Sequence, residues 1–129
     1  MIYLTLDDIC HINRGMIQAF GGTYIEANRN LHNVGSLYYI LDAIQYSLMG
    51  IDLCPTLIDK AAALAWSIIT RHIFYDGNKR TGMEAALELL EINGISTNFD
   101  RTVPDISVAV ALGSISFEDF REWIYAHVC

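Results

Sequence analysis

Residues 71–82 decide how this chain folds, and they read Arg71-His72-Ile73-Phe74-Tyr75-Asp76-Gly77-Asn78-Lys79-Arg80-Thr81-Gly82. They span the junction of two stretches with helical spacing of apolar residues, 55–73 and 78–93. The apolar stripe of the first stretch continues onto His72, which predicts an imidazole facing the core side. The pattern therefore predicts two core helices joined by a short loop. The upstream stripe consists of Ile58, Ala61, Ala62, Ala65, Ile68 and Ile69.

The start of the second helix carries two cations, Lys79 and Arg80. A helix N-terminus is already partially positive and exposes N–H donors, so it favours acidic side chains rather than basic ones. The cations make physical sense if an anion binds there, and phosphate is a common guest of helix N-termini. Gly77 lacks a Cβ and allows backbone amides to face that anion. The sequence predicts a phosphate site at this position.

Two further side chains could supply chemistry to bound phosphates. Asp76 offers a hard oxygen ligand, and Mg²⁺ is commonly held by a carboxylate together with phosphate oxygens. His72 could accept the proton of an attacking hydroxyl. A base, a metal ligand and a phosphate clamp within one segment predict phosphoryl or nucleotidyl transfer.

Each of these residues also has a purely structural interpretation. A histidine at the end of a helix can bond to the last carbonyls and suits the negative end of the dipole. Asp76 could begin a turn or cap the next helix, because Asp-Gly is common in turns. Asn78 could also be a cap. We expect Phe74 to anchor the loop and Thr81 to pack in the first turn.

The order His72-x-Phe74-x-Asp76-Gly77-Asn78-Lys79-Arg80-Thr81 resembles the signature of the Fic/Doc superfamily. Fic AMP-transferases carry proline after the histidine, glycine at the position of Lys79 and a second arginine three residues after Arg80. This chain has Ile73, Lys79 and Met83 at those positions. All three departures resemble the death-on-curing (Doc) branch of the superfamily.

The resemblance implies a fold and a site. The fold would be a compact all-α bundle of about six helices, with the motif loop between two core helices. His72 would be the base, Asp76 would hold or orient Mg²⁺, and the phosphates of ATP would be bound by the four residues that follow. Those residues are Gly77, Asn78, Lys79 and Arg80.

The resemblance also implies an activity. Members of the Doc branch are toxins of type II toxin–antitoxin systems that transfer the γ-phosphate of ATP to a threonine of elongation factor Tu, which arrests translation. A cognate antitoxin would then be a partner. Two alternatives stay open, a Fic-type protein AMP-transferase and a helical module that binds an antitoxin without catalysis.

The rest of the chain predicts further helices within one domain, residues 1–129. Thr5 and Ser116 should cap the first and last helices. We expect a helix from Ser36 to Met49 ended by Gly50, and one from Thr102 to Gly113. Residues 21–35 form a long irregular loop, at the place where the family carries a flap over its active site, and residues 95–99 form a short extended piece. Side chains expected to face inward include Ile9, Ile12, Met16 and Phe20, then Tyr39, Ile40, Ala43, Ile44 and Leu48, then Ile106, Val110 and Ala111.

Composition narrows the class of protein. A net charge of −7 with only eight Lys or Arg residues argues against nucleic-acid binding, which requires a basic surface. Although 53% of residues are hydrophobic, no apolar run approaches the ~20 residues of a membrane span. Three widely spaced cysteines without metal-ligand spacing are typical of reduced thiols. These features predict a cytoplasmic protein.

Overall fold

The computed structural model describes residues 1–46, 54, 56–99 and 105–129. These residues form an all-α fold, as predicted, with extended backbone limited to two isolated bridges, Leu31–Phe74 and Thr97–Val128. None of the described helices has the length and apolar character needed to cross a bilayer. The helices are α1 (Leu6–Phe20), the 3₁₀ helix η1 (Glu26–Asn28), α2 (Val34–Gln45), α3 (Leu57–Thr70), α4 (Asn78–Ile92), α5 (Asp105–Leu112) and α6 (Phe117–Ala126).

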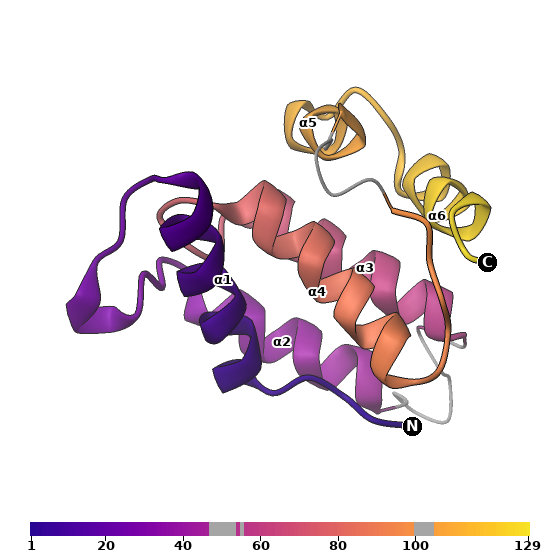
Figure 1. Ribbon diagram of the computed structural model, residues 1–129, viewed down its shortest axis with the longest axis horizontal. Helices are drawn as coiled ribbons and strands as arrows, with labels where there is room; N and C mark the ends of the chain where they lie inside the picture. Colours follow the sequence, from indigo (N-terminus) through magenta and orange to yellow (C-terminus); the bar gives the residue numbers. More distant parts are fainter. Residues whose placement is uncertain (47–53, 55, 100–104) are drawn as a thin grey trace.

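Helices α3 and α4 form an antiparallel hairpin at the centre, and residues 71–77, the motif loop, join them at one end (Figure 1). Helix α3 contacts α2, α4, α5 and α6, while α1 packs against α4. Gly82 permits the close approach within the hairpin, because a Cβ at this position would lie 2.9 Å from Ile69 Cγ1 and 3.0 Å from the Ala65 carbonyl oxygen. The hairpin therefore fixes where the motif loop emerges from the core.

Local signals predicted most helix ends. Thr5 and Asp8 form a reciprocal capping box at the start of α1, and the hydroxyl of Ser116 accepts from the Asp119 amide at the start of α6. Gly113, with a φ of 72°, follows the end of α5. These predictions are confirmed because each depends on a side chain within four residues of the helix end.

The start of α2 was predicted wrongly. Its cap is Asn33, whose side-chain oxygen accepts from the Ser36 amide at 3.3 Å, so the helix begins earlier than a Ser36 cap would allow. Tyr39 is then 71% exposed, and Leu37 and Leu41 are buried instead. Helix α2 ends at Gln45 with Tyr46 as its C-cap, so the predicted run to Met49 is too long. The predictions on Leu48, Gly50 and residues 102–104 lie outside the described residues.

Two other side chains expected in the core also lie elsewhere. Phe20, at the last position of α1, is 56% exposed, and Ile17 takes the buried place near that end. Ala111 is exposed, whereas Val110 beside it is buried. Both exposed residues lie near the motif loop, as described below.

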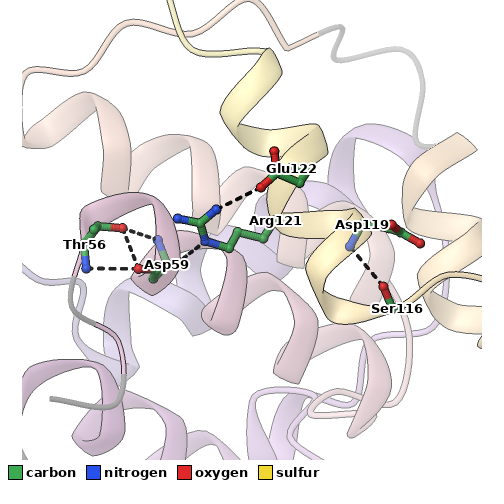
Figure 2. A network of polar contacts seen from close by, with 6 residues as sticks. All are labelled: Thr56, Asp59, Ser116, Asp119, Arg121 and Glu122. Atoms are coloured by element: carbon green, nitrogen blue, oxygen red, sulfur yellow. Dashed lines mark hydrogen bonds and ion pairs between the residues drawn. The ribbon is translucent and has the colours of Figure 1, made fainter. Parts of the chain in front are cut away.

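An ion pair joins the C-terminal helix to the central hairpin. The Arg121 side chain donates to the Asp59 carboxylate, which also accepts from the Thr56 amide and hydroxyl at the start of α3 (Figure 2). Burial by itself raises the pKa of Asp59, but the hydrogen bonds from Arg121 and Thr56 outweigh it, and the pKa lies below its ordinary value. The pair ties α6 to the first turn of α3.

We expect this pair to make stability depend on acid pH. Because the pKa of Asp59 is lower in the folded state, its contribution is fully present above the unfolded value of about 3.9 and is lost as the pH falls through the folded pKa. Asp59→Asn should lower the free energy of unfolding by about 1 kcal/mol at pH 7 and by less at pH 3. Urea unfolding at several pH values measures this difference.

Glu122→Gln is the matched control. Glu122 accepts from the same guanidinium at 3.2 Å, but its side chain is 69% exposed. An equal pH dependence in both variants would contradict the role of Asp59.

Candidate active site

The chain leaves α3 through a left-handed residue, His72. Helix α3 ends at Thr70 with Arg71 as its C-cap, and His72 has a φ of 48°. The amide of Ile73 then donates to the carbonyl oxygen of Ile68 at 3.5 Å, and Ile73 is fully buried. Glycine is the usual residue in this position of a helix C-terminal motif, since a Cβ is disfavoured there.

This turn corrects the prediction that His72 faces the core. The left-handed residue breaks the helical repeat, so Ile73 enters the core and the His72 side chain is exposed. Backbone strain of this kind concentrates at functional sites. The spacing of apolar residues could not predict this turn, because the prediction extended the helix to residue 73.

His72 borders a hollow of about 160 Å³ beside the start of α4. The hollow brings together five of the residues predicted for the site, and α5 closes one side of it with Ala111. The lining residues are Ile69, His72, Tyr75, Asp76, Gly77, Asn78, Lys79 and Ala111.

The start of α4 presents free backbone donors. Gly77 is its N-cap, with a φ of 79°, and the first bond of the helix runs from the Thr81 amide to the Gly77 carbonyl. The amides of residues 78–80 thus precede the first intrahelical bond and point out of the helix end. A Cβ on Gly77 would lie 3.0 Å from Ile17 and 3.1 Å from Asn13, so only glycine fits the turn.

Asn78 clamps the motif loop and does not cap the helix. Its side-chain amide donates to the Phe74 carbonyl at 2.8 Å, and its side-chain oxygen accepts from the Phe74 amide at 2.9 Å. Phe74 is buried, as predicted for an anchor. The two bonds close the loop into one ring, which fixes Asp76 and Gly77 between them.

Lys79 and Arg80 differ from three arginines elsewhere in the described residues. Arg14, Arg29 and Arg121 are each paired with a carboxylate. In the part of the chain that the structure describes, neither motif cation has a carboxylate within ion-pair distance. Their charge is therefore available to an anion at the helix start.

A second hollow, of about 170 Å³, lies on the α1 side of the motif loop. It shares Asp76, Gly77, Asn78 and Lys79 with the first hollow, and Arg80 lines only this one. The segment that should bind phosphates is thus accessible from two sides. The remaining lining residues are Met16, Ile17 and Gly21.

The Asp76 carboxylate is exposed and held by backbone donors. Its Oδ2 accepts from the Thr23 amide and its Oδ1 from the Gly77 amide, both at 2.8 Å. A Cβ on Gly22 would lie 2.6 Å from Oδ2, so this glycine lets the chain pass the carboxylate. Each oxygen keeps a lone pair, and one carboxylate with phosphate oxygens suits Mg²⁺. In the described ranges, no group of three or more His, Cys, Asp or Glu residues is arranged as a metal site.

Two buried asparagines, Asn13 and Asn30, fix the motif loop from behind. Asn13 Nδ2 donates to the Asp76 carbonyl at 2.9 Å and to Thr81 Oγ1 at 3.1 Å. Asn30 Nδ2 donates to Asn13 Oδ1 at 3.1 Å and to the Thr23 carbonyl at 3.0 Å. The role of neither residue was predicted from the sequence. The available signal was an amide on the apolar face of α1, between Ile9 and Ile17.

The loop of residues 21–33 lies along the motif loop. The amides of His32 and Asn33 both donate to the Ile73 carbonyl, at 2.8 and 3.0 Å, and the Tyr75 amide donates to the Asn30 carbonyl at 2.9 Å. Figure 1 shows this loop beside the link between α3 and α4. It lies where the resemblance implied a flap, and residues 21–33 are called the flap loop below.

Comparison with known proteins agrees with this geometry. The model of the Fic/DOC family matches residues 3–90, which include the flap loop, the motif loop, helices α1 to α3 and most of α4. Toxin Doc of Mycolicibacterium smegmatis is 38% identical over 98 residues, which cover 76% of this chain and 69% of that protein. On these grounds the chain belongs to the Fic/Doc family and, within it, to the Doc branch.

Proposed function

We propose that this protein is a Doc-type toxin that transfers the γ-phosphate of ATP to a hydroxyl of a target protein. The observation that carries the proposal is the hollow between His72 and the start of α4, where a base, a carboxylate and unpaired positive charge meet. Phosphoryl transfer depends mainly on positioning and on stabilising charge, and these residues supply both.

The roles of the residues follow from their places in the two hollows beside the start of α4. The imidazole of His72 takes the proton as the target hydroxyl attacks the γ-phosphorus. The bond between that phosphorus and the bridging oxygen of the β-phosphate breaks, and ADP leaves with its electron pair. Gly77 leaves room for the phosphates at the helix start, and the backbone amides of residues 78–80, with the side chains of Lys79 and Arg80, hold them. Asp76 would hold or orient the Mg²⁺ that accompanies ATP, and this ion would neutralise phosphate charge.

Family membership supports proposals about the partners and the location of the protein. The target would be elongation factor Tu, whose modification arrests translation, and the protein would act in the cytoplasm. The name of the relative, Toxin Doc, supports a toxin controlled by an antitoxin. We propose that the antitoxin lays an extended or helical tail against the surface near the flap loop.

The direct test uses elongation factor Tu and ATP labelled at either the α or the γ phosphate. We expect label from the γ position on the target and none from the α position. Met83 is half-buried and packs against the core, at the position where a Fic AMP-transferase carries its second arginine. The absence of that arginine at position 83 disfavours transfer of AMP.

The other outcomes separate the alternatives. Label from the α position alone would establish an AMP-transferase. No label from either position, with antitoxin binding retained, would indicate a module without catalysis. Growth arrest that disappears in Lys79→Ala would separate a toxin from such a module in cells.

A further inference from the structure

The guanidinium of Arg80 lies over the ring of Phe20, with Cζ 3.8 Å from the ring centroid. Phe20 is the last residue of α1, and Arg80 lies in the first turn of α4. The ring is 56% exposed, so the core does not require it. A large apolar side chain at this place is thus explained by its contact with the arginine.

A ring positions a guanidinium in a way that a carboxylate cannot. Stacking uses the flat face of the guanidinium and leaves the N–H donors in its plane free. A carboxylate would bind the same donors and neutralise the charge. Elsewhere in the described residues, Arg14 and Arg29 are held by such carboxylates, Glu26 and Asp7.

The stacked arginine borders the second hollow, beside Asp76, Gly77, Asn78 and Lys79. A free arginine side chain samples many rotamers, and binding an anion must restrict them. Contact with the ring restricts them beforehand, while the donors stay available for phosphate oxygens. The aromatic side chain thereby prepares the arginine for its ligand.

We propose that Phe20 is a positioning residue that holds Arg80 ready for the phosphates of ATP, an inference that rests on the proposed function. It predicts that the effect of Phe20 on nucleotide binding passes entirely through Arg80. It also predicts that an aromatic ring, and not merely an apolar side chain, is required at position 20.

The test measures the affinity for ATP·Mg²⁺, by titration calorimetry, in the absence of target protein. Phe20→Leu should weaken binding about two- to fivefold, the range of an exposed cation–π contact. Phe20→Tyr keeps a ring and should bind as the wild type does. In an Arg80→Ala background, Phe20→Leu should cause no further loss, as expected when one residue acts through the other.

Three results would overturn the inference. They are an unchanged affinity for ATP in Phe20→Leu, a weakened affinity in Phe20→Tyr, and a loss of affinity from Phe20→Leu in the Arg80→Ala background equal to that in the wild type. Urea unfolding of each variant shows whether the fold itself is affected. A wild-type protein that binds no ATP would overturn the proposed function itself. That failure is thereby distinguished from one in which ATP binds and Phe20 has no effect.

Discussion

Replacing His72 with glycine is expected to stop phosphate transfer while making the fold more stable. Removal of a general base lowers a rate by about 10²–10⁴. The backbone at residue 72, with a φ of 48°, is a conformation that glycine adopts without the steric cost of a Cβ. We expect the free energy of unfolding to rise by about 1 kcal/mol. Transfer kinetics and urea unfolding on the same preparation measure both effects.

His72→Ala separates the two contributions. Alanine removes the imidazole but keeps the Cβ, so it should lose activity as glycine does and gain no stability. Destabilisation in both variants would instead indicate that the imidazole supports the end of α3, the structural interpretation. Transfer at the wild-type rate in either variant would exclude His72 as the base.

Replacing Asn13 with alanine is expected to destabilise the protein by about 2–4 kcal/mol. The change removes both bonds donated by Asn13 Nδ2, and it leaves the Asn30 amide without its Asn13 partner in a fully buried setting. Because the Asp76 carbonyl loses its best donor, transfer should fall as well, even though Asn13 lines neither hollow. Urea unfolding and transfer kinetics measure these losses.

Gln18→Ala is the control on the same helix. Gln18 is exposed on α1, so its truncation should change the free energy of unfolding by less than about 0.5 kcal/mol. A small effect at both positions would mean that water replaces the bonds of Asn13. Lost stability with unchanged transfer would mean that the motif loop keeps its shape without this support.

The sequence predicted the features that depend on near neighbours. The caps at Thr5 and Ser116, the start of α4 and the anchoring role of Phe74 each follow from a few consecutive residues. Residues 76–79 line one hollow together with His72, because the loop that connects them to His72 is short and keeps them close to it.

Features that depend on distant partners were missed. Asn13 and Asn30 are buried because they bond to one another and to Asp76, which lies far along the chain. Phe20 was expected in the core because it lies on the apolar face of its helix. The periodicity of apolar residues could not show that its ring lies outside the core and contacts Arg80. The left-handed backbone of His72 could not be predicted, because the spacing of apolar residues says nothing about φ. A glycine at this position would have indicated such a turn, and a histidine does not.

The bonds from Asn30, His32 and Asn33 to residues 73–76 have a dynamic consequence. Separating residues 30–33 from the motif loop breaks the bonds of the Ile73 carbonyl and the Tyr75 amide together, so neither segment opens alone. Amide protons of His32, Asn33 and Tyr75 should therefore exchange with deuterium at one shared rate, as a single cooperative unit. A ligand that binds to either segment would slow the exchange of amide protons in both.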